Sequence, residues 1–276
     1  AYQVLVASSR ELLDKEQGDL WDSGQVHSDE SVHIVYDGKT LITGQKCFWK
    51  VRLADEQGNW TSWSEPAYWQ MGLFAGDWSA HWIGSAEMES QSVGGRPVDN
   101  KMFDPWFRKT FTLTESLKEA LIYVASIGYQ ELYVNGCKIG NAVLAPSVTD
   151  HKSRARYVTY DISHYLKKGE NVIALWLGTS WAVFPAYQRN DEPAIPMALA
   201  QAEITLTSGS KVRVITDGSW KTHASPNMLM GYWDAHHFAG EFYDASLEIN
   251  GWNEVGFDDS DWEEAKVYRP QVMVSA

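Results

Sequence analysis

Strand-like runs, several of them with apolar and polar residues in strict alternation, follow one another along most of this chain. The clearest is GYQELYVNGCKIG at 128–140, in which two alternating runs flank Asn135 and Gly136. An Asn-Gly pair in this position predicts a β-hairpin with a type I′ turn, because that turn needs a positive φ at both central residues. Two stretches depart from the strand pattern. RELLDKEQG at 10–18 predicts a short helix or loop, and ISHYLKKGEN at 162–171 predicts a helical turn that ends at Gly169.

The spacing of the strand-like runs predicts an all-β chain with two domains. About seven short runs near the start of the chain, including SVHIVYD at 31–37, fit a fibronectin type III-like sandwich. The later runs, about eight or nine with long and uneven loops, fit a larger jelly-roll β-sandwich of two packed sheets. We therefore assign residues 1–74 to the fibronectin type III-like sandwich and 75–270 to the jelly-roll β-sandwich. Residues 271–276 are assigned to the start of a connection to a further domain.

The net negative charge of the chain limits the kinds of partner that it can bind. The formal net charge is −13 and no local cluster of Lys and Arg offsets it, so we expect no nucleic-acid binding. No apolar run approaches the ~18 residues needed to cross a bilayer, so we expect no membrane span. The chain begins inside a strand-like run, AYQVLVASS, which indicates a fragment of a longer protein.

The two cysteines, Cys47 and Cys137, lie in different predicted domains. A disulfide needs Cα atoms within about 7 Å of each other, so we expect these two thiols to stay unpaired. Free thiols leave the redox compartment open.

The sequence carries no familiar catalytic motif. It holds no HExxH, CxxC, DxDxDG or GxSxG pattern. The densest acidic stretch, GFDDSDW at 256–262, predicts a turn in which Asp258 or Asp259 caps backbone N–H groups above a packed Trp262. A glycosidase needs two carboxylates that face each other across a sugar, and no pair in this sequence is singled out by such a motif.

The best candidate for a ligand-binding loop is TSWAVFPAYQRNDEP at 179–193, which combines aromatic rings with planar polar groups. Aromatic rings stack on the apolar face of a sugar, and polar side chains fix its hydroxyl groups. The candidate sugar-binding residues are Trp181, Tyr187, Arg189 and Asp191. The alternative is that Trp181 and Phe184 close the core while the polar residues only face water.

Calcium is the candidate metal ion, because jelly-roll loops often hold it through carboxylate and carbonyl oxygens. PVDNKMFD at 97–104 supplies Asp99 and Asn100 as candidate ligands, and YQRNDEP at 187–193 is a second candidate stretch. Zinc is disfavoured, because the adjacent His236 and His237 would point to opposite faces of a strand. We expect no cofactor to be required.

Three groups of phrases follow one another in a characteristic order. The first is YQVLVASS, LWDSGQV, WKVRLADEQGNWTSWSEPAYWQMGL and DWSAHWIG, the second runs from IGYQELYVNG to NVIALWLGTSW, and the third is GEFYDASLEINGWNEVGFDDSDWEEA. Together they resemble the N-terminal region of bacterial α-L-rhamnosidases of glycoside hydrolase family 78. The first resembles a fibronectin-like domain, the second the β-sandwich domain after it, and the third the closing segment of that sandwich.

The resemblance implies a parent enzyme that hydrolyses terminal α-L-rhamnose from glycosides or polysaccharides by an inverting mechanism. Its catalytic residues would lie in an (α/α)6 barrel that follows these sandwiches, so no catalytic residue is assigned here, and we expect the 276 residues alone not to be catalytic. The resemblance also implies a scaffold role, intramolecular contact with that barrel and, in some members, calcium-assisted binding of a rhamnose-containing carbohydrate. We favour a periplasmic or secreted location over a cytoplasmic one. The alternative is a stand-alone carbohydrate-binding or adhesion β-sandwich protein.

Overall fold

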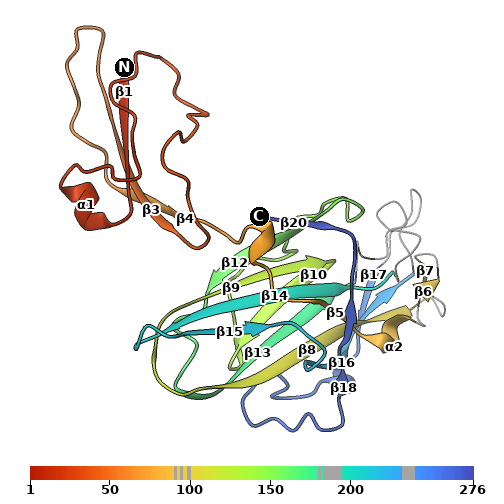
Figure 1. Cartoon of the computed structure of the whole chain (residues 1–276). Helices are drawn as coiled ribbons and strands as arrows, with labels where there is room; N and C mark the ends of the chain where they lie inside the picture. Colours follow the sequence, from red (N-terminus) through yellow and green to blue (C-terminus); the bar gives the residue numbers. More distant parts are fainter. Residues whose placement is uncertain (90–91, 94–95, 98–100, 180–181, 183–193, 232–239) are drawn as a thin grey trace. The chain divides into compact units, whose positions relative to one another are not determined.

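The computed structural model divides the chain into two compact units, Ala1–Asp77 and Trp78–Ala276 (Figure 1). It describes residues 1–89, 92–93, 96–97, 101–179, 182, 194–231 and 240–276. The regular secondary structure of both units is mainly β-strand, which confirms the predicted all-β fold. Among the helices of these described ranges, none is long and apolar enough to cross a membrane.

The first unit is organised around one antiparallel sheet. Its elements are β1 (Tyr2–Ala7), α1 (Arg10–Asp14), β2 (Trp21–Asp22), β3 (Lys46–Leu53), β4 (Ala67–Gln70) and the 3₁₀ helix η1 (Ala75–Asp77). The strands pair in the order β2-β1-β3-β4. Alternation along β1 places Leu5 and Ala7 on one face, against Leu13 of α1, and Val6 on the other face with Cys47. The stretch 10–18, predicted to be a short helix or loop, therefore forms a helix over Arg10–Asp14, and the apolar side of this helix packs on the sheet.

The strand predicted at 31–37 is wrong, because these residues form an irregular segment. His33 has a φ of 59°, in the left-handed region that an extended strand does not use. The Tyr36 hydroxyl donates to the backbone oxygens of Leu20 at 3.2 Å and Lys39 at 2.7 Å, which ties this end of the segment to neighbouring loops. Val32, Ile34 and Tyr36 line a cavity together with residues of the sheet, whereas Val35 is exposed.

The second unit is the larger β-sandwich. Its described strands and helices are β5 (Trp82–Gly84), α2 (Ala86–Glu89), β6 (Ser92–Val93), β7 (Arg96–Pro97), β8 (Lys101–Leu113), β9 (Leu117–Ile127), β10 (Tyr129–Val134), β11 (Cys137–Lys138), β12 (Arg154–Asp161), β13 (Gly169–Gly178), β14 (Met197–Leu206), β15 (Lys211–Ile215), β16 (Lys221–Met230), β17 (Gly240–Tyr243), η4 (Ala245–Leu247), β18 (Glu263–Glu264), β19 (Lys266–Tyr268) and β20 (Met273–Ser275).

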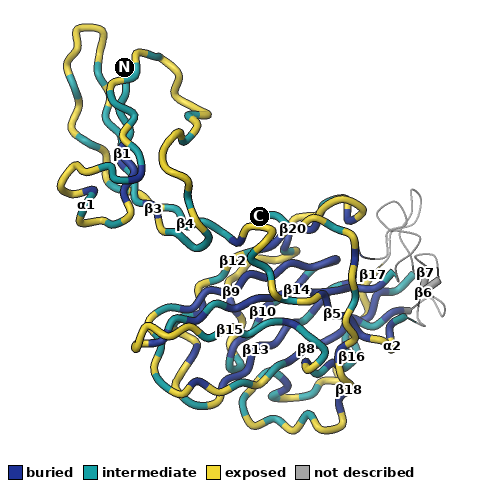
Figure 2. The backbone as a smooth tube through the Cα atoms, in the orientation of Figure 1, coloured by how far each residue is buried: buried dark blue, intermediate teal, exposed yellow. Residues whose placement is uncertain are grey.

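Fourteen of these strands form two seven-stranded sheets, and β6 pairs with β7 in a separate two-stranded sheet. One follows the order β11-β10-β13-β8-β16-β17 with β18 beside β16, and the other follows β19-β5-β14-β9-β12-β20 with β15 beside β14. The core between them consists mainly of aliphatic side chains, such as Leu175 of β13 and Val124 of β9. Figure 2 shows this core as the buried residues along the central strands of the unit. The predicted pair of packed sheets is confirmed.

The hairpin predicted at 128–140 is confirmed as β10 and β11. Asn135 and Gly136 have φ angles of 49° and 83°, as a type I′ turn requires. The Asn135 side chain donates to the backbone oxygen of Tyr165 at 2.7 Å and accepts from the backbone N–H of Val172 at 2.9 Å. These bonds fix the turn to β13 and its preceding loop, so the hairpin is part of the scaffold.

The helical turn predicted at 162–171 is reduced to a turn at 163–165, and β13 already begins at Gly169. The buried side chain of Asn171 takes the place of further helical bonds. It accepts from the backbone N–H of Lys167 at 2.9 Å and donates to the backbone oxygens of Lys167 at 2.7 Å and Gly169 at 2.9 Å. Side-chain bonds of this kind compete with helix formation.

Candidate functional site

The sheet that contains β8 and β13 has an outer face, defined here as the face opposite the core between the two sheets. On β8, Asp104, Trp106 and Arg108 share this face, because alternate residues of a strand point to the same side, while Phe107 points into the core. Trp106 pairs in register with Trp176 of β13, and the two rings meet edge to face with centroids 5.7 Å apart. The outer face therefore carries polar and aromatic side chains where an ordinary exposed sheet would be only polar.

One part of the outer face is covered by residues 249–262. Trp106 lies in a stack between Trp252, with centroids 4.5 Å apart, and Trp262, with centroids 6.3 Å apart. The turn predicted at 256–262 is confirmed, since the Asp258 carboxylate accepts from the backbone N–H of Ser260 at 3.1 Å and Trp262 is buried. The aromatic stack closes this part of the face to solvent.

Arg108 of β8 binds the covering segment, residues 249–262, through its side chain. Its side chain is completely buried, forms an ion pair with Asp259, and donates through Nη2 to the backbone oxygen of Glu254 at 3.0 Å. The guanidinium also lies 5.2 Å from the centre of the Phe257 ring. The sequence does not predict this role for Arg108, because its partners are about 150 residues away in the chain.

A cavity of about 290 Å³ opens on the outer face where Asp104 lies. Its lining combines aromatic rings, carboxylates and an apolar loop. The lining residues are Asp104, Tyr129, Gln130, Glu131, Val143, Leu144, Trp176, Leu177, Gly178, Asn227 and Glu241. A small concave site with a few fixed polar groups is the usual form of a ligand pocket.

Asp104 is the most buried carboxylate of this cavity, with 3% of its surface exposed. Its Oδ1 accepts from the backbone N–H of Thr179 at 2.6 Å and from the Thr179 hydroxyl. Its Oδ2 accepts from Nδ2 of Asn227 at 2.6 Å. Burial raises the pKa of Asp104 to about 6, although these hydrogen bonds act in the opposite direction. The carboxylate thus joins β8 to β16 and to the residue that follows β13.

A bulge in β16 brings Asn227 to Asp104. Ala224 pairs with Pro105 and Met228 pairs with Phe103, so residues 225–227 of β16 lie opposite the single residue Asp104 of β8. Such bulges re-aim side chains and are common beside functional sites. Nδ2 of Asn227 also lies 3.4 Å from Oε1 of Glu241 on β17. Pro226 within this strand is the sequence signal that marks the bulge, because proline cannot donate to a ladder.

All six predicted site residues lie outside the described residues: Trp181, Tyr187, Arg189, Asp191, Asp99 and Asn100. Their roles stay predictions. The structure does place one end of each predicted stretch. Thr179 is the first residue of 179–193, Asp104 is the last residue of 97–104, and the two are hydrogen-bonded. One described end of the stretch predicted for sugar binding is therefore hydrogen-bonded to one described end of the stretch predicted for calcium.

No group of three or more His, Cys, Asp and Glu side chains within the described ranges is arranged to hold a metal ion. Glu131 is already engaged, because it accepts from the Tyr133 hydroxyl at 2.6 Å and pairs with Lys138. The cavity therefore offers aromatic rings and hydrogen-bonding groups. Its polar groups suit a hydroxylated ligand.

The raised pKa of Asp104 predicts a pH-dependent stability. The pKa of about 6 in the folded chain exceeds the usual Asp value of about 3.9, so the folded state holds the proton more tightly. The free energy of unfolding should fall as the pH rises from about 4 to about 6 and stay lower above that, by roughly 3 kcal/mol. Asp104→Asn should remove this loss. Urea unfolding at about pH 4.5 and about pH 7.5 should therefore show the variant gaining stability relative to the wild type as the pH rises.

The control for this experiment is Asp258→Asn. A hydrogen bond with Ser260 lowers the pKa of the Asp258 carboxyl, so that group stabilises the folded state above its unfolded pKa. That contribution changes only below about pH 4, so between about pH 4.5 and about pH 7.5 the Asp258→Asn variant should keep a nearly constant difference in stability from the wild type. Equal pH profiles for the Asp104→Asn variant and the wild type would contradict the assignment of a raised pKa to Asp104.

The fold joins a small unit built on one antiparallel sheet to a large two-sheet β-sandwich. The family profile described as "Alpha-L-rhamnosidase N-terminal domain" matches residues 115–275. A second profile, "Rha78A-like, N-terminal immunoglobulin domain", matches residues 1–75. The chain belongs to the α-L-rhamnosidase N-terminal domain family, which confirms the resemblance found in the sequence.

Relatives match along nearly the whole chain but over a minor part of their own length. An α-L-rhamnosidase of Formosa agariphila is 33% identical over 97% of this chain and 29% of its own sequence. The solved α-L-rhamnosidase of Dictyoglumus thermophilum is 35% identical with a TM-score of 0.82, covering 98% of this chain and 30% of that one. The α-L-rhamnosidase of Streptomyces avermitilis, solved in complex with L-rhamnose, has a TM-score of 0.82 at 20% identity, covering 99% of this chain and 42% of that one, and shows the shared fold alone. The chain thus spans about 30% of the curated relatives it matches.

Proposed function

We propose that this chain is the non-catalytic N-terminal part of an α-L-rhamnosidase that hydrolyses terminal α-L-rhamnose by an inverting mechanism. The observation that carries the proposal is the identity of 33% and 35% to α-L-rhamnosidases along almost the entire chain. The role of this part is to give scaffold and to contact the (α/α)6 catalytic barrel of the parent protein. Its second unit also binds the sugar.

The sugar site of this proposal is the cavity at Asp104. At about 290 Å³ it lies at the small end of ligand pockets, which suits one sugar ring. Tyr129 and Trp176 supply aromatic surface, and Glu241 is exposed and can accept from a sugar hydroxyl. Val143 and Leu144, which are 77% and 68% exposed, give an apolar contact for the methyl group of a deoxy sugar. An exposed apolar pair beside carboxylates favours rhamnose over a fully hydroxylated hexose.

The predicted loop residues extend this proposal. Trp181 would stack on the sugar, while Arg189 and Asp191 would hydrogen-bond its vicinal hydroxyl groups. Calcium, bound through Asp99 and Asn100, would take the same hydroxyl groups as ligands. The hydrogen bond between Asp104 and Thr179 supports this extension, since it joins the ends of the two stretches that carry these residues.

The test uses the purified 276-residue chain in two measurements. An aryl α-L-rhamnoside should be left uncleaved, and L-rhamnose titrated by calorimetry or NMR should bind weakly, with a Kd on the order of 0.1–1 mM. Tyr129→Ala should weaken this binding at least about tenfold. Tyr68→Ala, which removes an exposed tyrosine of the first unit, should leave it unchanged. Repeating the titration with calcium and then with a chelator tests the ion.

Each outcome bears on a separate part of the proposal. Cleavage of the aryl rhamnoside that depends on an acidic residue of this chain would contradict its non-catalytic role. Absence of rhamnose binding up to tens of millimolar, in calcium and in chelator, would leave the scaffold role and remove the sugar site. Binding that survives Tyr129→Ala would place the sugar elsewhere.

A further inference from the structure

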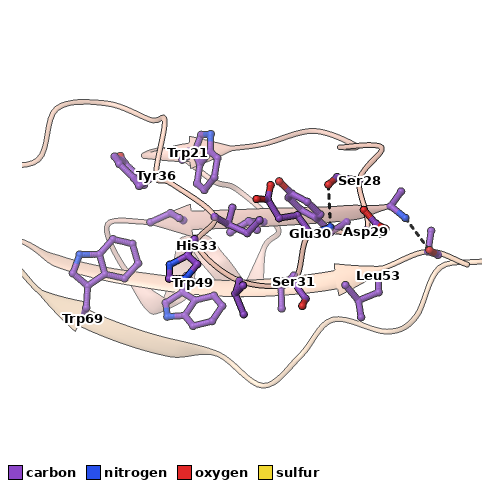
Figure 3. Close-up of a pocket in the computed structure, with 18 residues that line it drawn as sticks. Trp21, Ser28, Asp29, Glu30, Ser31, His33, Tyr36, Trp49, Leu53 and Trp69 are labelled. Carbon is purple, nitrogen blue, oxygen red and sulfur yellow. Dashed lines mark hydrogen bonds between the residues drawn. The ribbon is translucent and has the colours of Figure 1, made fainter.

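The first unit holds a cavity larger than the one at Asp104, a slot of about 770 Å³ (Figure 3). Its floor is the sheet face opposite α1, formed by side chains of β1 and β3 with Trp21 of β2 and Trp69 of β4. Its roof is the irregular segment 28–36. The slot has the size of a small-molecule pocket.

The side chains that form the floor of the slot are shortest in its middle. Register across β1 and β3 gives three successive rungs on this face: Tyr2 with Leu53, Val4 with Val51, and Val6 with Trp49. The two valines of the middle rung are short, while the rungs beside them carry a tyrosine and a tryptophan. This order of side chains leaves a shallow apolar depression between larger rings, which fits a flat ring lying on its face.

The roof is tied at both ends and free in the middle. Tyr2 and Val26 exchange two backbone hydrogen bonds at 3.0 and 2.9 Å, just before the roof begins. At the other end Tyr36 meets the rings of Trp21 and Trp69 edge to face, with centroids 5.5 and 6.2 Å apart. The described backbone hydrogen bonds include none from residues 29–35 to the sheet. The left-handed conformation of His33 is uncommon for a residue with a side chain, and such backbone persists where its surroundings hold it.

The polar lining excludes some ligands. Asp29 and Glu30 line the slot, and its lining includes no Lys or Arg side chain. These carboxylates would repel an anionic ligand, and the basic groups of the lining are His33 and the amino group of Ala1, which donates to the backbone oxygen of Ala54 at 3.0 Å. The carboxylates and the hydroxyl groups of Ser28 and Ser31 can instead accept from, or exchange hydrogen bonds with, ligand hydroxyl groups.

We propose that this slot binds an uncharged, hydroxylated ring compound, whose apolar face lies on Val4 and Val51 beside Trp49 and whose hydroxyl groups meet Asp29 and Glu30. The source of such a ring is a sugar or a hydroxylated aromatic compound, because both combine a flat apolar face with hydroxyl donors. The site is separate from the cavity at Asp104, and it does not depend on the rhamnosidase function proposed above.

The test is a titration of the whole chain by NMR with two uncharged probes, methyl α-L-rhamnoside for the sugar source and 1,5-dihydroxynaphthalene for the aromatic source. Naphthalene-1,5-disulfonate serves as the anionic counterpart. At least one uncharged probe should bind, and Val51→Phe, which fills the depression, should weaken that binding at least about tenfold. Val35→Phe is the matched control, because Val35 is 79% exposed and lies in the irregular segment 28–36 without lining the slot. It should change the affinity less than about twofold, and the disulfonate should bind at least about tenfold more weakly than dihydroxynaphthalene.

A second slot variant keeps the test decisive if Val51→Phe does not fold. Leu53→Trp enlarges a lining residue that is 55% exposed, so the sheet can accept it, and it should also weaken binding. The proposal is overturned if neither uncharged probe binds up to about 10 mM, or if a folded slot variant binds as the wild type does. Sugar binding that is lost in Tyr129→Ala but kept in Val51→Phe belongs to the cavity at Asp104. In that case only the aromatic probe can support the slot.

Discussion

Replacement of Asp259 by Ala is expected to lower the free energy of unfolding by about 3–5 kcal/mol. The substitution would leave Arg108 without its ion-pair partner, and the Arg108 side chain is completely buried on the outer face of the sandwich. Its Nη1 would lose its carboxylate partner, while Nε already has no hydrogen-bond partner among the described residues. Only the bond from Nη2 to the backbone oxygen of Glu254 would remain. A buried cation without a counter-charge is among the largest single destabilising changes.

Two further variants separate this mechanism from general damage to the turn. Asp258→Ala removes the neighbouring exposed carboxylate, which caps Ser260 and has no buried partner, so its effect should be much smaller. Adding Arg108→Met to Asp259→Ala removes the unpaired charge and keeps an apolar chain against Phe257, so it should restore most of the lost stability. Urea unfolding gives all these values. If the double variant were as unstable as Asp259→Ala, the loss would come from the turn itself.

The elements that the sequence predicts well are those fixed by neighbouring residues. The hairpin at Asn135 and Gly136 depends on two φ angles, and the turn at 256–262 depends on the bond between Asp258 and Ser260. The error at 31–37 has a different origin. The spacing of apolar residues predicts only that part of that segment faces the sheet. An irregular segment that covers the sheet can give the same spacing as a strand.

The candidate site was only partly predictable, because its contacts join distant parts of the chain. The partners of Asp104 are Thr179 and Asn227, which are 75 and 123 residues away. Composition indicated the stretches that contain Asp104 and Thr179, but their hydrogen bond arises from the pairing of β8 with β13. The slot in the first unit is less predictable still, since its depression exists only once the rungs of β1 and β3 are in register.

A second large loss of stability is expected from a substitution at Gly128, which directly precedes strand β10 of the Asp104 cavity. This residue has a φ of 95°, and a Cβ atom placed on it would lie 2.3 Å from the backbone oxygen of Gly178, which lines the cavity. Gly128→Ala therefore combines a left-handed backbone cost of about 1–2 kcal/mol with a clash that only movement of β10 against β13 can relieve, about 1–3 kcal/mol more.

Gly209→Ala isolates the steric part of that effect. Gly209 has nearly the same φ, 89°, but open space around its Cβ position, so its loss should be limited to about 1–2 kcal/mol. Because Gly128 precedes Tyr129, movement of β10 should also displace a lining residue of the cavity and weaken L-rhamnose binding, whereas Gly209→Ala should leave that binding unchanged. Urea unfolding and the rhamnose titration on both variants provide the comparison. Equal losses of stability would show that the close approach of Gly128 to Gly178 carries no energetic penalty, and the two strands would then be free to shift around the site.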